Sequence, residues 1–360
     1  MSTYWIMRLL LKGLGGVGLV VGLGLGLVYQ FQEKLLYLPR IPGVSNDFAY
    51  LPDRFGLAYE DVELTAQDGT KLHSWMMWPS GWSSQKRRSR PTVLFFQENA
   101  GNMSFRLPFL RLVAHHLGCS VFAPSYRGYG LSQGTPTESG LQLDAQASLE
   151  YLLKNPAVQK DNVVVFGRSL GGAVAFHLAA TNPGAINSLI VENTFWSIEA
   201  VTGKVMPFLS PFIGPGRLFN WLIRNQWRND EAITQLGQLP VLLISSVEDE
   251  MLPPEHMERM HKVLVRQQGR VSWLPLHAGH MDAYEVAAEE YWPAVIKFAQ
   301  QHTTVSATDE AEDDGDDEGV EAAVHASAAG LKPPAAAGPF VTDSSQPSNT
   351  PSGQAVKKEL

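Results

Sequence analysis

Short apolar runs and longer helical segments alternate along the chain from residue 92 to residue 300. The runs are rich in β-branched and aromatic residues and lack polar alternation, which predicts strands that are buried on both faces. The segments between them carry apolar residues at helical spacing, which predicts helices that connect parallel strands. The predicted strands are residues 92–96, 120–124, 163–166, 189–191, 241–244 and 271–274, and the predicted helices are residues 102–117, 138–153, 254–267 and 284–300.

A hairpin is predicted ahead of this alternating region. Two strand-like segments, residues 62–64 and 72–75, flank the dipeptide Asp-Gly at residues 68–69, which is a strong turn signal. His73 lies in the second segment, where we expect a structural role. Residues 80–90 are polar and basic and predict a solvated loop, with a contact to lipid headgroups as the alternative. The whole pattern predicts an α/β fold with a mostly parallel eight-stranded sheet, helices on both faces and ligands beyond the carboxyl ends of the strands.

One longer apolar segment interrupts the alternation between the strands predicted at 189–191 and 241–244. Residues 195–228 hold many aromatic and aliphatic side chains, and three prolines divide them into short pieces. An insertion at this point lies over the carboxyl ends of the strands. We therefore expect a cap that forms an apolar pocket for an acyl or alcohol group. The alternative is a segment that serves only packing.

The first residues of the chain carry targeting information. Residues 13–31 contain no charged side chain, and nineteen helical residues span about 28 Å, close to one hydrocarbon core. Two basic residues, Arg8 and Lys12, precede this segment, whereas one charge of each sign follows it. This bias predicts an uncleaved signal-anchor at residues 1–32, with the remainder in the lumen of the endoplasmic reticulum or another endomembrane. A cleaved signal peptide and an interfacial helix are the alternatives.

Three glycines recur at four-residue spacing within the predicted anchor, namely Gly18, Gly22 and Gly26. Small residues at that spacing let two helices approach closely in lipid, so a homodimer through this face is a hypothesis. Beyond the anchor we expect one α/β domain at residues 33–302 and a tail at residues 303–360.

The net charge of −8 is concentrated in the predicted tail. Residues 303–360 contain 3 basic and 11 acidic side chains, and 3 − 11 = −8, so the rest of the chain is close to neutral. A neutral domain argues against a nucleic-acid surface. The acidic run and the Ala, Gly, Pro and Ser residues after it predict disorder. The final residues Lys357–Leu360 resemble a retrieval signal of the endoplasmic reticulum.

The sequence contains one cysteine, Cys119. A single cysteine cannot form an internal disulfide or a metal site with other thiolates. Its apolar neighbours predict a small buried side chain. We predict neither a metal nor a cofactor for this chain.

The candidate chemistry centres on residues 162–172, where a β-branched and aromatic run ends in Gly-x-Ser-x-Gly. Gly167, Ser169 and Gly171 form this motif, and the small apolar residues 173–180 after it predict a helix. A strand, a tight turn and a helix are the context in which this motif presents a nucleophilic serine. The glycines leave room for the turn, and Ser169 then stands beside the positive end of the helix dipole. The alternative is a structural serine in a glycine turn.

A serine hydroxyl needs a base that removes its proton and an acid that holds the base. In this context the chain order is serine, acid, histidine. Glu248, Asp249 and Glu250 follow the strand predicted at 241–244, and each could be the acid. We prefer Asp249, because a solvated loop charge is the ordinary role of the other two.

Two histidines follow the strand predicted at 271–274, and either could be the base. They are His277 and His280. Gly279 directly precedes His280 and allows a tight approach to the serine, so His280 is preferred.

The oxyanion that forms on attack needs backbone N–H donors. One donor is expected to be the amide of Leu170, the residue after the nucleophile. The other is expected from the loop at residues 97–102, where a glycine and small residues let the backbone approach the substrate. We name Asn99 for this donor, with Ala100 as the alternative, and a plain strand-to-helix loop as the competing interpretation.

Five motifs occur in the order that one known family shows. They are residues 97–102, 126–132, 167–172, 248–254 and 279–282. Over residues 30–302 the chain resembles the α/β-hydrolase superfamily, and within it the single-pass membrane hydrolases that include alpha/beta hydrolase domain-containing protein 13 and the bud-emergence-related proteins. The resemblance implies Ser169 as nucleophile, Asp249 as acid and His280 as base. Many members have His-Gly where this chain has Gln-Glu at residues 97–98.

These observations predict a membrane-anchored serine hydrolase that cleaves an acyl ester or thioester of a lipid-like or acylated substrate through an acyl-enzyme on Ser169. No cofactor is expected for this chemistry. A hypothesis from a different class is a catalytically silent scaffold with the same fold, which would use the glycine-rich anchor and the acidic tail to bind partners. The complete set of Ser169, Asp249 and His280 favours the enzyme.

Overall fold

One eight-stranded sheet organises the protein in the computed structural model, which describes residues 3–304. The strand order across the sheet is β1-β2-β4-β3-β5-β6-β7-β8. The predicted α/β fold with a mostly parallel eight-stranded sheet is confirmed. The strands are β1 (Leu57–Thr65), β2 (Lys71–Pro79), β3 (Thr92–Phe96), β4 (Ser120–Pro124), β5 (Val163–Arg168), β6 (Ser188–Glu192), β7 (Val241–Ser246) and β8 (Val271–Leu276).

The first two strands differ in direction from the rest of the sheet. β1 and β2 form an antiparallel hairpin, and β2 runs antiparallel to β4. The remaining neighbours, from β4 through β3, β5, β6 and β7 to β8, pair in parallel. Because parallel strands share one carboxyl edge, the residues that follow β3, β5, β6, β7 and β8 meet at that edge.

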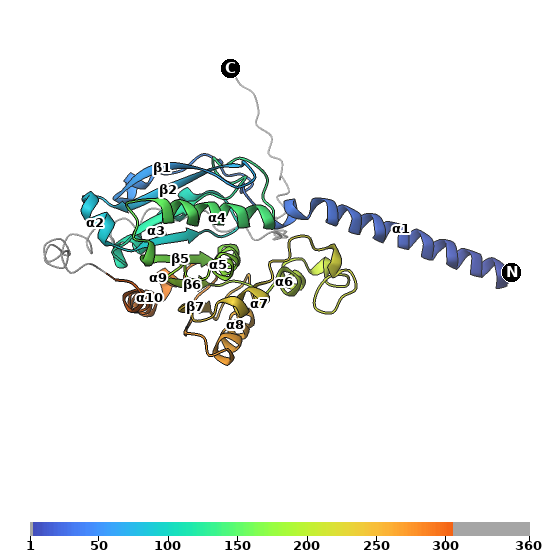
Figure 1. Cartoon of the computed structure of the whole chain (residues 1–360). Coiled ribbons are helices and arrows are strands. Elements are labelled where there is room, and N and C mark those ends of the chain that lie inside the picture. The colour runs from blue at the N-terminus through green and yellow to red at the C-terminus, as the bar shows by residue number, and fades with distance from the viewer. Residues whose placement is uncertain (1–2, 305–360) are drawn as a thin grey trace, which may run out of the picture.

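Helices connect the strands and cover the sheet (Figure 1). The chain also forms short 3-10 turns, of which η4 (Pro207–Leu209) and η5 (Asn220–Leu222) lie in the cap segment. The helices are α1 (Thr3–Leu36), α2 (Ser84–Ser89), α3 (Leu107–His116), α4 (Glu138–Lys154), α5 (Leu170–Thr181), α6 (Ile198–Val205), α7 (Asn229–Ala232), α8 (Glu255–Arg266), α9 (Ala283–Val286) and α10 (Ala288–His302).

Apolar side chains fill both faces of the sheet. Along β3, Val93 and Phe95 belong to one core cluster, whereas Leu94 and Phe96 belong to the other. Successive side chains of a strand point to opposite faces, so a run without polar residues must be covered on both sides. Helices α3 and α10 contribute to the first cluster, and α4, α5 and α8 contribute to the second.

Three predicted segments differ in detail from the structure. Residues 80–90, predicted as a loop, contain the short helix α2, which begins where the Ser83 side chain accepts a backbone N–H. The helix predicted at 102–117 opens with a 3-10 turn before α3. The helix predicted at 284–300 is divided at Ala287 into α9 and α10. Local hydrogen bonds at element ends set these details, and periodicity does not report them.

Two other side chains, those of Cys119 and His73, lie away from the candidate site. Cys119 is fully buried, as predicted, and burial raises the pKa of its thiol. His73 lies in the hairpin with its Nε2 2.7 Å from a carboxylate oxygen of Asp61. Neither side chain contributes to the cluster described below.

Helix α1 projects from the domain as one continuous rod (Figure 1). The span Leu11–Leu36 is long and apolar enough to cross a membrane. The helix continues past residue 32, the predicted end of the anchor, and its last turn packs on the domain. Apart from the adjacent residues and the nearby backbone of the helix itself, no heavy atom of residues 3–304 lies within 4 Å of a Cβ placed on Gly18, Gly22 or Gly26. This face is therefore open in a single chain, and the homodimer stays a prediction.

The cap segment lies between β6 and β7, as its place in the sequence predicts. Leu209, Ile213 and Ile223 form a small apolar cluster of their own there, and Val28 of α1 packs against it. The acidic run of the predicted tail and the terminal residues that resemble a retrieval signal lie at residues 305–360, outside the described residues. The limits proposed for the anchor, domain, cap and tail stay predictions.

Candidate active site

The turn between β5 and α5 holds Ser169 in a strained backbone conformation. Ser169 has φ 54° and ψ −119°, a combination that residues with a side chain rarely adopt. A Cβ on Gly167 would overlap the carbonyl oxygen of Gly171, and a Cβ on Gly171 would overlap the carbonyl of Phe96. Both positions therefore require glycine. Thr194 Oγ1 donates a hydrogen bond to the Ser169 carbonyl oxygen at 2.7 Å and helps to hold the turn.

Ser169, His280 and Asp249 form a continuous hydrogen-bonded chain at the carboxyl edge of the sheet. Nε2 of His280 lies 3.0 Å from Oγ of Ser169, and Nδ1 of His280 lies 2.6 Å from Oδ2 of Asp249. In the tautomer that carries the ring proton on Nδ1, His280 donates to the Asp249 carboxylate and its Nε2 can accept the Ser169 hydroxyl proton. All three residues are buried, so little water competes for these bonds.

The three consecutive carboxylates after β7 have three different partners. Asp249 contacts the His280 ring, and Glu250 accepts a hydrogen bond from the His280 backbone amide at 3.1 Å. Glu248 instead lies 3.4 Å from Nδ1 of His277, whose side chain is 86% exposed. The structure therefore brings Asp249 and His280 to the serine, and it leaves Glu248 and His277 at the surface.

Asn193, at the end of β6, is a residue that the sequence pattern did not single out. Its Nδ2 donates hydrogen bonds to the His280 carbonyl oxygen and to Ser246 Oγ, each at 2.9 Å. Its Oδ1 accepts the Ser246 amide at 2.7 Å. Asn193 therefore ties the ends of β6 and β7 to the loop that carries His280. A polar residue directly after a buried strand is the signal that could have identified it.

The candidate oxyanion donors Leu170 and Asn99 line one cavity together with Ser169 and His280, and so does the alternative donor Ala100. The cavity has a volume of about 400 Å³ and lies between the sheet edge, the cap and the end of α1. Helix α6 and the residues around it supply much of its apolar wall. Within residues 3–304, no cluster of three or more His, Cys, Asp or Glu side chains could hold a metal ion.

The loop that carries Asn99 is tied to the end of α1. Nδ2 of Asn99 donates a hydrogen bond to the Leu36 carbonyl oxygen at 2.5 Å, and Oδ1 accepts one from the Leu38 amide at 3.1 Å. Oδ1 also accepts the Tyr129 hydroxyl at 2.8 Å, and Tyr126 donates its hydroxyl to the same loop at 3.0 Å. These contacts engage both the amide nitrogen and the amide oxygen of the Asn99 side chain, and the oxyanion role of its backbone amide stays a prediction.

A buried charge network lies beneath the serine. Arg168 donates hydrogen bonds to Glu98 at 3.1 Å and to Glu192 at 3.0 Å, and Tyr291 donates its hydroxyl to Glu192 at 2.7 Å. Arg106 donates to Glu98 at 2.6 Å. Burial alone would raise the pKa of Glu98, but the Arg106 and Arg168 charges outweigh it and lower that pKa. The sequence analysis did not predict this network. The signal that could have revealed it is a charged residue at or just after the end of each of three buried strands, namely Glu98, Arg168 and Glu192.

Comparisons with known proteins agree with this architecture. The family described as alpha/beta hydrolase fold matches residues 91–212. The esterase Pf2001 of Pyrococcus furiosus superposes with a TM-score of 0.57 at 20% identity, over 74% of this chain and 99% of that chain. At this identity the likeness concerns the fold alone.

Beyond the likeness in fold, several relatives match most of the chain in sequence. The chain is 40% identical over 295 residues to the alpha/beta hydrolase domain-containing protein WAV2 of Arabidopsis thaliana, covering 80% of this chain and 93% of that protein. It is 40% identical over 248 residues to protein bem46 of Schizosaccharomyces pombe, covering 69% and 80%. It is 31% identical to the membrane protein YNL320W of Saccharomyces cerevisiae, covering 79% and 94%. With this similarity and this fold, the chain belongs to the α/β-hydrolase family.

Proposed function

We propose that this protein is a membrane-anchored serine hydrolase that cleaves an acyl ester or thioester through an acyl-enzyme on Ser169. The observation that carries the proposal is the buried hydrogen-bonded chain from Ser169 through His280 to Asp249, with distances of 3.0 and 2.6 Å, beside a cavity of about 400 Å³. The family and the esterases of the same fold support a hydrolase. The apolar cavity wall supports an acylated or lipid-like substrate.

In the proposed reaction, Ser169 Oγ attacks the acyl carbonyl carbon while Nε2 of His280 takes the hydroxyl proton. The positive charge that develops on His280 lies against the carboxylate of Asp249. Collapse of the tetrahedral intermediate breaks the C–O or C–S bond, and His280 gives its proton to the leaving alcohol or thiol. Water then attacks the acyl-enzyme by the same route, which releases a carboxylic acid and restores Ser169.

The negative charge on the tetrahedral intermediate requires donors that are already in place. In the proposal, the amide of Leu170 is one donor and the amide of Asn99 is the other, with Ala100 as the alternative. Leu170 is the first residue of α5, so the positive end of that helix dipole also faces the oxyanion.

We further propose that the hydrolase domain lies on the lumenal side of the membrane. The basic residues Arg8 and Lys12 precede the apolar span, and cytosolic flanks carry an excess of such residues. The substitution Asp68→Asn turns residues 68–70 into an Asn-Gly-Thr glycosylation acceptor in an exposed hairpin turn. A glycan at this position in endoplasmic reticulum membranes is expected, and an unmodified chain would contradict the lumenal topology.

Fluorophosphonate labelling of the full-length protein tests the catalytic proposal. We expect the probe to label the wild-type chain and to leave the Ser169→Ala chain unlabelled, since it reacts with an activated serine. The melting temperatures of both chains serve as the control for folding. A folded wild-type chain that neither labels nor hydrolyses acyl esters would instead favour the silent scaffold.

A further inference from the structure

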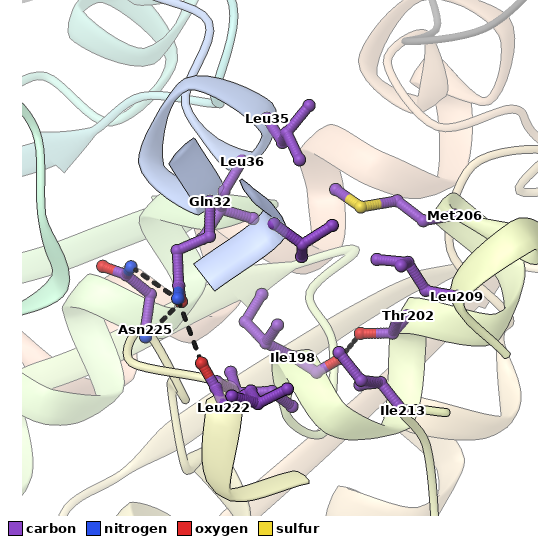
Figure 2. A pocket seen from close by; sticks show the side chains of 12 residues that line it. Gln32, Leu35, Leu36, Ile198, Thr202, Met206, Leu209, Ile213, Leu222 and Asn225 are labelled. Carbon is purple, nitrogen blue, oxygen red and sulfur yellow. Dashed lines mark hydrogen bonds between the residues drawn. The ribbon is translucent and has the colours of Figure 1, made fainter. Parts of the chain in front are cut away.

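The last turn of α1 is bonded to the cap. Nε2 of Gln32 donates a hydrogen bond to the Leu222 carbonyl oxygen at 3.0 Å, and its Oε1 accepts one from the Arg224 amide at 2.7 Å. Glu33 pairs with the Arg224 guanidinium at 2.5 Å and accepts Nδ2 of Asn225 at 2.9 Å. The set therefore holds the anchor helix in one position against the cap, as Figure 2 shows around Gln32.

A buried polar cluster continues this junction just beyond the helix. The Tyr37 hydroxyl donates a hydrogen bond to Oδ1 of Asn225 at 3.1 Å and accepts one from the indole N–H of Trp227 at 3.0 Å. The same Oδ1 accepts the Glu138 amide at 2.7 Å. Tyr37, Asn225 and Trp227 are all buried, so loss of one partner would leave an unsatisfied polar group. The anchor and the cap therefore behave as one structural unit.

The large cavity over the serine has a neighbour that extends along α1. This second space has a volume of about 50 Å³ and lies between the helix and the cap (Figure 2). Leu36, Ile198 and Met206 line both spaces, so their side chains form the partition between them. The smaller space reaches Val28, which belongs to the apolar span Leu11–Leu36. Two mostly apolar spaces, separated by these side chains, thus lie one after the other between Ser169 and the membrane helix.

The cap presents apolar side chains to solvent beside these two spaces. Phe208, Leu218 and Trp221 have exposed fractions of 56%, 86% and 72%. The guanidinium of Arg224 lies 4.9 Å from the centre of the Tyr29 ring on α1. Exposed aromatic and aliphatic residues next to a membrane helix, with a basic group at the same level, are typical of the layer where lipid headgroups meet acyl chains. This edge of the cap therefore fits the surface of the bilayer.

We propose that the acyl chain of a membrane glycerolipid reaches Ser169 sideways, between α1 and the cap, while the lipid remains in the bilayer. The chain end lies toward Val28 and the ester carbonyl lies at the serine. In the proposal, Met206, which lines both spaces and is unbranched and flexible, moves aside so that the acyl chain can pass from one space to the other. The proposal rests on the proposed hydrolase activity of Ser169 and adds the lipid class and its route.

The position of the path favours a lipid over an acylated protein. The small space reaches a residue inside the apolar span, and the exposed apolar edge of the cap places bilayer over the approach. A glycerolipid holds both its acyl chain and its ester in this layer of the bilayer, whereas an acylated protein must also bring its polypeptide against the cap. Because α1 is bonded to the cap, the two spaces stay at a fixed depth relative to the membrane.

Two adjacent residues of α1 provide a matched test of the route. Val28 lines the small space, whereas Leu27 is 60% exposed on another side of the helix. The full-length chain in lipid nanodiscs is assayed with monoacylglycerols that carry a butyryl or a palmitoyl chain. For Val28→Trp we expect the palmitoyl-to-butyryl ratio of kcat/KM to fall at least about tenfold, because the indole fills the path. For Leu27→Trp we expect the wild-type ratio.

Two outcomes of this assay would overturn the proposal. Equal ratios for Val28→Trp and Leu27→Trp would show that the path is not used. A wild-type chain that hydrolyses an S-palmitoyl peptide added from solution, but no palmitoyl glycerolipid in its own nanodisc, would make the substrate an acylated protein. Melting temperatures and fluorophosphonate labelling of both variants separate a route effect from misfolding.

A binding measurement separates this proposal from the proposed activity. The Ser169→Ala chain in nanodiscs is exposed to a palmitoyl monoacylglycerol with a photoreactive diazirine at the chain end, and crosslinks are mapped by mass spectrometry. We expect crosslinks at Ile213 or Leu209, which line the small space. Such crosslinks without wild-type hydrolysis would refute only the activity. Labelling confined to exposed positions such as Leu23, together with active wild-type enzyme, would refute only the route.

Discussion

Two imidazole–carboxylate pairs come from the same two strand ends, after β7 and β8. In the first pair, His280 and Asp249 lie 2.6 Å apart, and 2% of each side chain is exposed. In the second pair, His277 and Glu248 lie 3.4 Å apart, with 86% and 68% of the side chains exposed. The two histidines are three residues apart, and the two acids are neighbours in the sequence.

The two pairs differ in burial, and burial decides which of them can hold a ring in position for proton transfer. Water screens an exposed ion pair, which typically contributes about 0–1 kcal/mol and does not orient a ring for proton transfer. In the buried pair little water competes, and the loop is fixed from both sides. Asn193 binds the His280 carbonyl oxygen, and the Gly279 amide donates to Asp282 Oδ1 at 2.8 Å. These contacts turn His280 inward and leave His277 outside.

The largest difference is expected when each imidazole is removed. His280→Ala should lower kcat/KM for a short acyl ester by about 10⁶-fold, because Ser169 loses the base proposed for it. His277→Ala should stay within about twofold of wild type, since its ring is solvated. Steady-state hydrolysis of p-nitrophenyl butyrate measures both. Comparable losses in the two variants would mean that the buried pair is not the reactive one.

Removing the negative charge from each acid should produce the next largest difference. Asp249→Asn should lower kcat by about 10⁴-fold, because an amide can stabilise the wrong ring tautomer of His280. Glu248→Gln should leave kcat unchanged. The same ester assay, with melting temperatures to exclude unfolding, decides the matter. An Asp249→Asn variant with the kcat of wild type would mean that another carboxylate is the acid.

The contrast between buried and exposed charges should also appear in stability. Glu98→Gln should lower the free energy of unfolding by about 3 kcal/mol, because it leaves the buried guanidinium groups of Arg168 and Arg106 without a full counter-charge. Glu63→Gln, which removes the exposed partner of Lys71, should cost about 0.5 kcal/mol or less. Denaturant unfolding of the full-length proteins in detergent compares the two.

Glu98→Gln is also expected to change how the free energy of unfolding depends on pH. The pKa of Glu98 lies below its ordinary value of 4.5 in the folded protein, so its ionised form is stabilised by folding. That stabilisation is complete above about pH 4.5 and is lost as the pH falls through the folded pKa. The free energy of unfolding should therefore fall more steeply below pH 4.5 in wild type than in Glu98→Gln. Parallel pH curves would contradict this assignment.

A smaller effect is expected from the carboxylate that holds the backbone. Glu250→Ala removes the acceptor of the His280 amide and should lower kcat by about tenfold with KM unchanged, since the ring shifts slightly from the serine. Glu248→Ala, at a neighbouring position, is the matched control. A loss in KM alone would instead indicate that Glu250 contacts the substrate in the cavity.

Much of the site was accessible from the sequence because each signal was local. The Gly-x-Ser-x-Gly spacing follows from steric exclusion at Gly167 and Gly171, and a buried strand is readable from its uninterrupted apolar run. The choice among Glu248, Asp249 and Glu250 was not local, since all three follow β7. Only the direction of the turn after the strand, held by amides that bond Asp249, decides which carboxylate points inward.

By itself, the sequence determined the order of strands and helices, the tight serine turn and the apolar span, because short-range periodicity and steric limits are properties of neighbouring residues. The tertiary structure alone decided that Asn193 and the Glu98–Arg168 network brace the serine, and that the anchor helix forms one wall of the cavity. Such contacts join residues far apart in the chain, such as Gln32 and Leu222. Their formation depends on how the packed elements bring distant polar groups out of water, which no local pattern records.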